Sequence, residues 1–589
     1  MIILPHIFFY LTIKGRYTRI NNFSRCKPGG ICNLKGEFML TVKQETVFRF
    51  LLPALVLLVF LVRLIDGFLP GVLLAPTPDS VEPFVGALRM CQGEKYGFTL
   101  NGEFFPSRYS PALSFLLMPA LFISSSPAAA GAVIGFWAMV LMLFAVLLFH
   151  KDKEYGGTAL ACGGLFLVPC FLEYCGSSMT EIPYAALLFI MLWLFRSMLE
   201  SEDDVPKLFF WYGITAGLCG FLRMTGYPML LLPALFLFSL CRRKKKLFMR
   251  SWVGLFFPSA LLTLFSVVYN WTVFGSPSRS GYHFHVPLPY EFPKLLFSLS
   301  CIPNNIDDTL KWGGRGLLII GAALLFAAFY AWLCRKKDFS HLRLFGAECA
   351  FVMLQLGILG LLYFPHYYFS MRFFFPVVLL FVWLLVRSAL GVVRELKIAG
   401  NTFISWSAWL IGIEIMLVGC FWPQQDYCGR EIAALCRFEK ALPAQAVLIH
   451  NFDPGRTELF FIRNHSGRKQ LPVTRKCEYA DKIALRKRVA ALPPVTEYKG
   501  GHRADFLHDI PGKIDFFPEV LEEAPQRILK KLLVQKNPVY ITGDGLNALT
   551  PEAYWTLRRH FLMKRVFQTP SGDVVFRIFL LPGKGEKDS

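Results

Sequence analysis

The stretch Leu74–Ser126 (LAPTPDSVEPFVGALRMCQGEKYGFTLNGEFFPSRYSPALSFLLMPALFISSS) decides how the chain is arranged. It follows the first long apolar segment directly, yet it carries charged residues throughout, from Asp79 to Arg108. Charges spaced in this way exclude a segment that crosses a bilayer in contact with hydrocarbon. The stretch is therefore expected to be a polar loop at a membrane surface.

Two helices are expected inside this loop. The first covers Ser80–Cys91, with Asp79 as its N-cap. The second covers Ser110–Phe122 and has Pro111 in its first turn. The apolar run of the second helix is about 15 residues long, short of the roughly 20 residues that a span needs. We expect this helix to lie in the membrane interface.

The composition is that of a polytopic membrane protein. Hydrophobic residues make up 54% of the 589 residues and charged residues only 17%. A net charge of +21 could suggest nucleic-acid binding, but the basic residues cluster in short loops such as Arg242–Lys246 and Arg335–Lys337. Cytoplasmic loops of membrane proteins have this character, so no nucleic-acid partner is expected. The 15 cysteines lie mostly in apolar segments without metal-ligand spacing, and no metal site is predicted from them.

The sequence predicts about 11 membrane spans, each an apolar segment of near-spanning length. The predicted spans are Thr46–Ile65, Ala128–Phe149, Thr158–Leu172, Ile182–Leu199, Lys207–Leu222, Pro228–Leu240, Ser251–Phe274, Gly316–Cys334, Ala347–Phe364, Phe373–Leu390 and Phe403–Phe421. With Ser110–Phe122 excluded from the spans, every strongly basic loop lies on the side of the N-terminus. The positive-inside rule then predicts a cytoplasmic N-terminus, and an extracytoplasmic Leu74–Ser126 loop and C-terminal region, in a multi-pass protein of the cell (inner or plasma) membrane.

The chain divides into three parts. Residues 1–45 are expected to be a cytoplasmic segment, either a disordered tail or an overextended start, since a more ordinary membrane-protein N-terminus begins at Met39. Residues 46–422 form the expected transmembrane domain, with 66–127 as its first extracytoplasmic loop. Residues 423–589 are expected to be a soluble α/β domain, because the strand-like runs VLIHNF, VYITG and VVFRIFL alternate with helical stretches such as EVLEEAPQRILKKLLVQ.

Acids and arginines gather at the predicted extracytoplasmic ends of the spans. They are Asp79, Glu82, Glu103, Glu173 and Glu181, and Arg89, Arg108, Arg223, Arg279, Arg315 and Arg372. For any single arginine, snorkelling to the interface explains the charge as well. Several guanidinium groups beside a carboxylate, however, suit the binding of a lipid-linked phosphate while a base activates a hydroxyl group.

The segments DSVEPFVGALRM and NGEFFPSRYSPALSFLLMPAL resemble the first extracytoplasmic loop of the membrane glycosyltransferases of the GT-C superfamily. The resemblance is to family 39, the bacterial relatives of protein O-mannosyltransferases, and it covers about Thr46–Leu390. Further similar segments follow in order: GSSMTEIPYAALLFIMLWLF, GLCGFLRMTGYPMLLLPALFLF, FGSPSRSGYHF and MRFFFPVVLLF.

This resemblance implies transfer of a sugar from a polyprenyl-phosphate donor to an acceptor hydroxyl on the extracytoplasmic face. It implies Asp79 as the general base. The family often has a second acid directly after the first, whereas this chain has Ser80 there and its next acid is Glu82, so Glu82 stays an alternative base. The residues that it implies for substrate binding are Arg108, Arg372, Arg223, Tyr109 and Glu181.

No cofactor is expected besides the lipid-linked sugar as co-substrate, although a divalent metal stays open. The expected partners are the lipid donor, membrane lipids and an acceptor that is a lipid, a glycan or a protein. A transporter or flippase for a lipid or sugar is the alternative function. Transporters usually contain internal repeats with paired broken helices, and no comparable halves are seen in this sequence.

Overall fold

The structure is a computed structural model, and it describes a large part of the transmembrane region and parts of the C-terminal region. The described residues are 54, 58, 78–100, 103–106, 110–125, 127–151, 155–168, 171–176, 178–200, 205–241, 245–274, 306–335, 339–363, 371–397, 406–415, 438, 441–450, 470–472, 521, 524–547, 549–568 and 574–581. The predicted segment 1–45 lies outside them.

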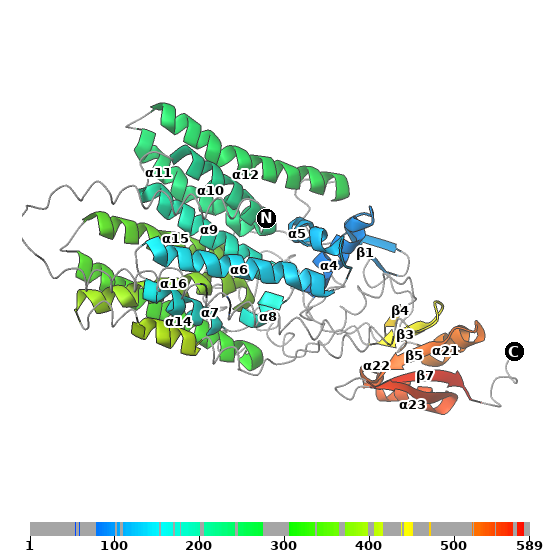
Figure 1. Ribbon diagram of the computed structural model, residues 1–589. Helices are drawn as coiled ribbons and strands as arrows, with labels where there is room; N and C mark the ends of the chain where they lie inside the picture. Colours follow the sequence, from blue (N-terminus) through cyan, green and yellow to red (C-terminus); the bar gives the residue numbers. More distant parts are fainter. Residues whose placement is uncertain are drawn as a thin grey trace, which may run out of the picture. The chain divides into compact units, whose positions relative to one another are not determined.

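The described part of the transmembrane region is a bundle of α-helices (Figure 1). Six of its helices are long and apolar enough to cross a membrane. These are α6 (Pro127–Lys151), α9 (Glu181–Glu200), α10 (Val205–Leu222), α12 (Lys245–Phe274), α15 (Phe339–Tyr363) and α16 (Met371–Glu395). An α-helix satisfies its backbone hydrogen bonds internally, so runs of apolar residues in lipid fold in this way.

Other predicted spans are shorter or interrupted in the structure. Segment Thr158–Leu172 becomes α7 (Tyr155–Phe166) followed by α8 (Phe171–Gly176), and Pro228–Leu240 becomes the 3₁₀ helix η3 (Met224–Leu230) followed by α11 (Leu231–Cys241). Helix α14 (Ile306–Cys334) is longer than the predicted Gly316–Cys334, but its apolar part is only Leu318–Cys334. The last span is described only as helical residues 406–415, and Thr46–Ile65 only at Ala54 and Leu58. The number of 11 spans therefore stays a prediction.

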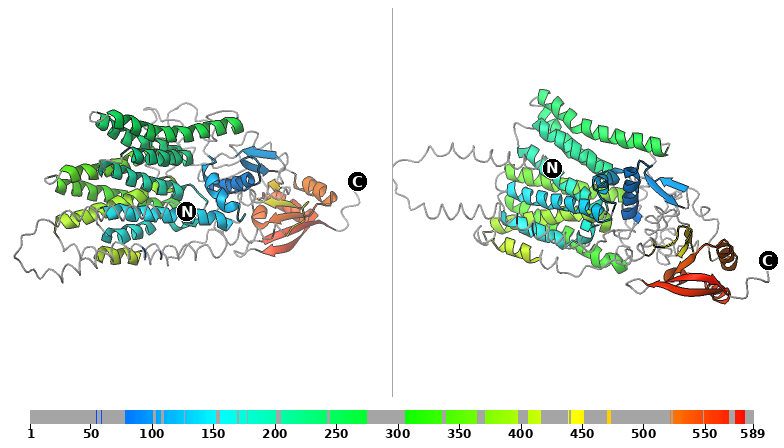
Figure 2. Two further views of the ribbon diagram at one scale, coloured as in Figure 1. Left: turned by 45° about the horizontal axis from the view of Figure 1, so that its top comes forward. Right: turned by 45° about the vertical axis from the view of Figure 1, so that its right-hand side comes forward.

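Helices α9 and α16 are mostly buried inside the bundle, whereas α12 is mostly exposed. Helix α12 lies at the edge of the bundle in each view (Figures 1 and 2). It packs closely on α10 because Gly213 has no side chain: a Cβ atom there would lie 2.3 Å from the backbone oxygen of Leu255. Small residues at such contacts allow membrane helices to approach backbone to backbone.

The predicted polar loop contains α4 (Pro78–Cys91), strands β1 (Gly97–Leu100) and β2 (Glu103–Pro106) paired antiparallel, and α5 (Ala112–Leu121). Helix α4 begins at Pro78, so Asp79 lies in its first turn and not at the expected N-cap. Proline is favoured at the first helical position because its fixed φ suits the helix and it lacks an N–H to satisfy. Helix α5 has 10 residues, about 15 Å of helix, which is too short to cross a bilayer.

In the C-terminal region the structure contains a five-stranded sheet of order β4-β3-β5-β7-β6. Its strands are β3 (Val447–His450), β4 (Gln470–Pro472), β5 (Val539–Thr542), β6 (Phe561–Gln568) and β7 (Val574–Leu580). Strand β3 is parallel to β4 and β5, and β7 is antiparallel to β5 and β6. Helices α21 (Pro525–Val534) and α23 (Pro551–His560) share an apolar core with one face of this sheet, and the short helix α22 (Gly543–Asn547) follows β5.

Candidate active site

The candidate site begins with an ion pair between two of the residues singled out in the sequence. Glu181 is the first residue of α9, and Arg223 stands between α10 and η3. The Arg223 Nη1 atom lies 3.3 Å from Glu181 Oε1, and the two side chains are 9% and 0% exposed. A buried carboxylate needs a charged or hydrogen-bonding partner, and Arg223 provides it.

Tyr184 lies one helical turn after Glu181 and connects this pair to the rest of the bundle. The Arg223 guanidinium lies 5.7 Å from the centre of the Tyr184 ring, a cation–π distance. The Tyr184 hydroxyl accepts hydrogen bonds from Thr225 Oγ1 at 2.8 Å and from Gln355 Nε2 at 2.6 Å. Tyr184, Thr225 and Gln355 are all buried. Arg223 is thus held by two residues of α9, and one of them, Tyr184, is held in turn by η3 and α15.

The chain turns tightly at this point because of two glycines. At Gly226 a Cβ atom would lie 2.5 Å from the backbone of Cys219, and at Gly220 it would lie 2.4 Å from the Tyr227 ring. Segment η3 can therefore fold back directly on the end of α10. Arg223 itself is extended, with φ −148° and ψ 124°, so it marks the break between the two helices.

The polar loop is attached to the same end of α10. The Ser110 hydroxyl donates a hydrogen bond of 2.7 Å to the carbonyl oxygen of Phe221, two residues before Arg223. In α5, the Phe115 ring lies 6.3 Å from the Phe221 ring. The Ser114 hydroxyl donates to the carbonyl oxygen of Pro83 at 2.7 Å, which joins α5 to α4. The loop elements α4 and α5 are therefore part of the structure around Arg223.

The structure describes the predicted site residues to different extents. Glu181 and Arg223 are brought together. Asp79 and Glu82 lie in the first turns of α4, and Arg372 is the second residue of α16, but their side chains are outside the described set. Arg108 and Tyr109 are outside the described residues altogether. The roles expected of these five residues stay predictions.

Sequence reasoning missed Tyr184, Thr225 and Gln355 as parts of this site. Gln355 could have been singled out from the sequence, because it is the one amide side chain within the apolar run AFVMLQLGILG of a predicted span. Polar side chains in membrane helices generally face the protein interior and bond across helices. Within the described ranges, no group of three or more His, Cys, Asp or Glu side chains is arranged to hold a metal ion.

No protein-family model and no curated protein matches the sequence. Among solved structures, the chain is similar to ArnT from Cupriavidus metallidurans bound to undecaprenyl phosphate. The match has a TM-score of 0.50 and covers 90% of this chain and 98% of that chain, at 13% identity. The chain has the GT-C fold.

A second GT-C structure is also similar to this chain: the Archaeoglobus fulgidus oligosaccharyltransferase tethered with an acceptor peptide containing the NVT sequon. It gives a TM-score of 0.47 over 90% of this chain and 74% of that chain, at 11% identity. The match to ArnT extends over nearly the whole of both chains.

Proposed function

We propose that this chain is a membrane glycosyltransferase that moves a sugar from a polyprenyl-phosphate donor to an acceptor hydroxyl on the extracytoplasmic face. The observation that supports this most is the GT-C fold over nearly the full length of ArnT, a protein whose structure holds undecaprenyl phosphate. The fold alone leaves the chemistry open, so the proposal also needs a site. The Glu181–Arg223 pair supplies a fixed guanidinium group at the end of a membrane helix.

Arginine is well suited to a lipid phosphate. Its guanidinium is planar, always charged and carries N–H donors in a fork that matches phosphate oxygens. In the proposed site Arg223 binds the donor phosphate together with Arg108 and Arg372. Tyr109 and Glu181 are the other proposed substrate-binding residues. The Ser110–Phe221 hydrogen bond supports this grouping, because two residues of chain reach at most about 7 Å, and Arg108 is two residues before Ser110.

Asp79 is the proposed general base. An acceptor hydroxyl loses its proton as it attacks the anomeric carbon, and a carboxylate within hydrogen-bond reach can take that proton. The departing lipid phosphate is already a stable anion, so it needs no acid. Glu82 is the alternative base, one turn further along α4. The acceptor remains a lipid, a glycan or a protein.

The test uses the purified chain in vesicles with lipid-linked sugars as donors. If the proposal is right, lipid-linked sugar is consumed and free polyprenyl phosphate appears in equal amount. Arg223→Lys, which keeps a positive charge beside the buried Glu181, should lower kcat/KM roughly 10- to 100-fold, the loss expected for one hydrogen bond to a charged group. The matched control is Arg89→Lys, since Arg89 pairs with Glu94 within the loop itself.

A transporter or flippase would give a different result in the same vesicles. The lipid-linked sugar would change sides while its phosphate–sugar bond stayed intact. The proposed function would be contradicted if the intact donor crossed the membrane and no polyprenyl phosphate were released with any acceptor supplied from a membrane extract.

If the donor is consumed, mass spectrometry of lipid-linked sugars and envelope glycans in cells without the gene would identify the sugar and the acceptor.

A further inference from the structure

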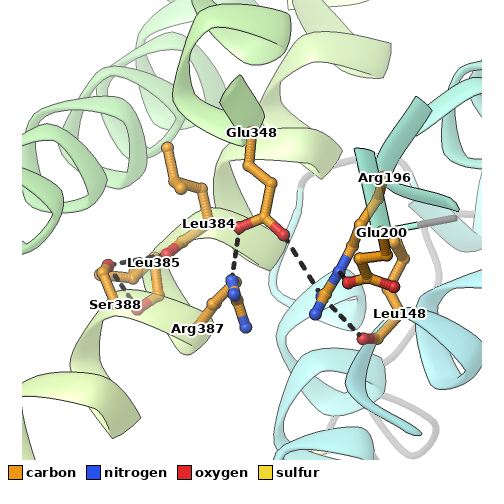
Figure 3. Close-up of polar contacts among 8 residues, drawn as sticks. All are labelled: Leu148, Arg196, Glu200, Glu348, Leu384, Leu385, Arg387 and Ser388. Atoms are coloured by element: carbon orange, nitrogen blue, oxygen red, sulfur yellow. Dashed lines mark hydrogen bonds and ion pairs between the residues drawn. The ribbon is translucent and has the colours of Figure 1, made fainter. Parts of the chain in front are cut away.

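A second group of buried charges lies on the same helices, far from the candidate site. We call Arg196, Glu200, Glu348 and Arg387 the charge cluster (Figure 3). Glu348 on α15 lies 3.2 Å from Arg196 Nη1 on α9 and 2.6 Å from Arg387 Nε on α16. Arg196, Glu348 and Arg387 are at most 3% exposed. The cluster thus joins three helices through one carboxylate.

Further contacts restrict the geometry of the cluster. Arg196 Nε lies 2.9 Å from Glu200 Oε1 one turn along α9, and Arg196 Nη1 also donates to the carbonyl oxygen of Leu148 on α6 at 3.2 Å. The Arg387 guanidinium lies 5.9 Å from the centre of the Trp383 ring. Glu348 is thus the one buried carboxylate between two buried arginines, and Arg196 has a second carboxylate partner in Glu200, whose side chain is 37% exposed.

The cluster and the candidate site are at opposite ends of α9. Glu181 begins this helix, and Arg196 lies near its end at Glu200, about 22 Å away along the axis. Helix α15 (Phe339–Tyr363) carries Glu348 before its midpoint and Gln355 two turns later, and α16 carries Arg372 at its start and Arg387 toward its end. Each of the three helices therefore bears part of the cluster, α9 and α16 also bear a residue of the proposed site, and α15 bears Gln355, which contacts Tyr184.

Apolar packing specifies the axial position of these helices only weakly. Helices α9 and α16 are buried over most of their surface and are lined largely by Leu, Phe and Val. In a membrane the surrounding lipid is as apolar as these side chains, so no hydrophobic force selects one offset. A step of one residue moves a side chain 1.5 Å along the axis and turns it 100° around it. A buried ion pair does not survive such a step.

We propose that the charge cluster fixes the axial register of α9, α15 and α16, and thereby positions Arg372 at the start of α16 and Glu181, the partner of Arg223, at the start of α9. Arg196, Glu348 and Arg387 are positioning residues, because they act through helix placement and touch no substrate. The inference rests on the proposed function, since it concerns the site that would bind the donor. Buried polar groups are known to set helix register in coiled coils, at a cost in stability.

The main test removes the whole cluster core at once. The variant R196M/E348L/R387M replaces the three buried charges by apolar side chains of similar size, and the carboxylate that loses its partner, Glu200, is exposed, so no buried charge is left unpaired. The unfolding temperature should stay near that of the unaltered chain, while KM for the lipid donor rises at least about tenfold, because a misplacement of about 1 Å can reduce activity by two orders of magnitude. Ser388→Ala is the control, since Ser388 bonds only within α16 among the contacts drawn in Figure 3. It should change neither value.

A distance measurement tests the register without using activity. Spin labels at Met353 on α15 and Leu396 just beyond α16 occupy exposed positions; they should be attached through unnatural amino acids because the chain has 15 cysteines. In the triple variant, or in Arg387→Lys if the triple variant does not fold, the distance should shift or broaden. An unchanged distance together with an unchanged KM in a folded variant would overturn the inference. If the unaltered chain transfers no sugar, the proposed function fails, and the label distance still decides whether the cluster sets the register.

Discussion

The ion pair of Glu181 and Arg223 depends on both partners being present. Glu181 is fully buried at the start of a membrane helix, where an isolated carboxylate would be costly. Breaking such a pair by removing one partner typically costs about 3–5 kcal/mol, because the other charge is left uncompensated. Substitutions at Glu181 therefore affect stability and activity together. Asp79, in the first turn of α4, allows the two effects to be separated.

Asp79→Asn should leave a folded protein whose transfer rate falls by roughly two to four orders of magnitude, the usual contribution of a general base. In the first helical turn the lost carboxylate charge changes stability by only about 0.3–1 kcal/mol, so folding should survive. The measurement is single-turnover transfer by purified, folded protein. Glu82→Gln is the control and should reduce the rate far less. The reverse order of effects would make Glu82 the base.

The helices of the bundle show which properties can be read from sequence. Apolar length predicted the long helices α6, α9, α10, α12, α15 and α16 within a few residues at most ends, because each is an apolar run long enough to cross a bilayer. Interhelical partners could not be predicted: Gln355 meets Tyr184, and Glu348 meets Arg196, only through tertiary packing. The pairing of Glu181 with Arg223 was likewise beyond reach, although both residues had been singled out.

The strands of the C-terminal region could also be predicted only in part from the sequence. Runs such as VVFRIFL predicted β7 well, because they are rich in β-branched and aromatic residues. Strand β6 (Phe561–Gln568) was missed. It is an edge strand that carries Lys564 and Arg565 next to each other, which interrupts the alternation of apolar and polar residues. Charges on edge strands protect a sheet from pairing with other chains, and they also hide the strand from pattern analysis.

Gly213→Ala should destabilise the contact between α10 and α12. A methyl group there would meet the backbone oxygens of Leu255 and Gly254 at 2.3 and 2.7 Å, so the helices would have to separate. Overpacking of this kind costs about 1–3 kcal/mol. Gly357→Ala is the matched control, because a Cβ atom at Gly357 would meet no atom within 4 Å apart from the backbone of its own helix. Alanine also favours the helical conformation over glycine by up to about 1 kcal/mol. Thermal unfolding in detergent should give a lower midpoint for the first variant only. Equal midpoints would show that α12 can move away freely.

At the scale of the whole molecule, the positions of the basic residues behind the +21 net charge predict which side of the membrane each loop occupies. In the topology predicted from the sequence, the strongly basic segments, such as Arg242–Lys246, all lie on the side of the N-terminus. The prediction rests on the positive-inside bias of membrane insertion. Helix α5 has only 10 residues and is too short to be a span, so it does not change the number of predicted spans.

Reporter fusions should therefore give opposite signals after Lys246 and after Glu439. An enzyme active only in the cytoplasm should be active after Lys246 and inactive after Glu439, because the chain between them is expected to contain an odd number of spans. A reporter active only outside the cytoplasm should show the reverse pattern. Matching signals at the two sites would mean that the span count is wrong by one.

The charge cluster also bears on how the protein is made. Arg196 enters the membrane with α9 long before Glu348 has been synthesised, and an arginine in a nascent span opposes insertion, by up to about 2.5–3.5 kcal/mol at the helix centre. Glu200 lies one turn further on the same helix and pairs with Arg196 at 2.9 Å. The nascent helix thus carries its own counter-ion when it inserts, and Glu348 becomes a second partner of Arg196 once α15 has been made. Arg387 is made last, when its partner is already in the membrane.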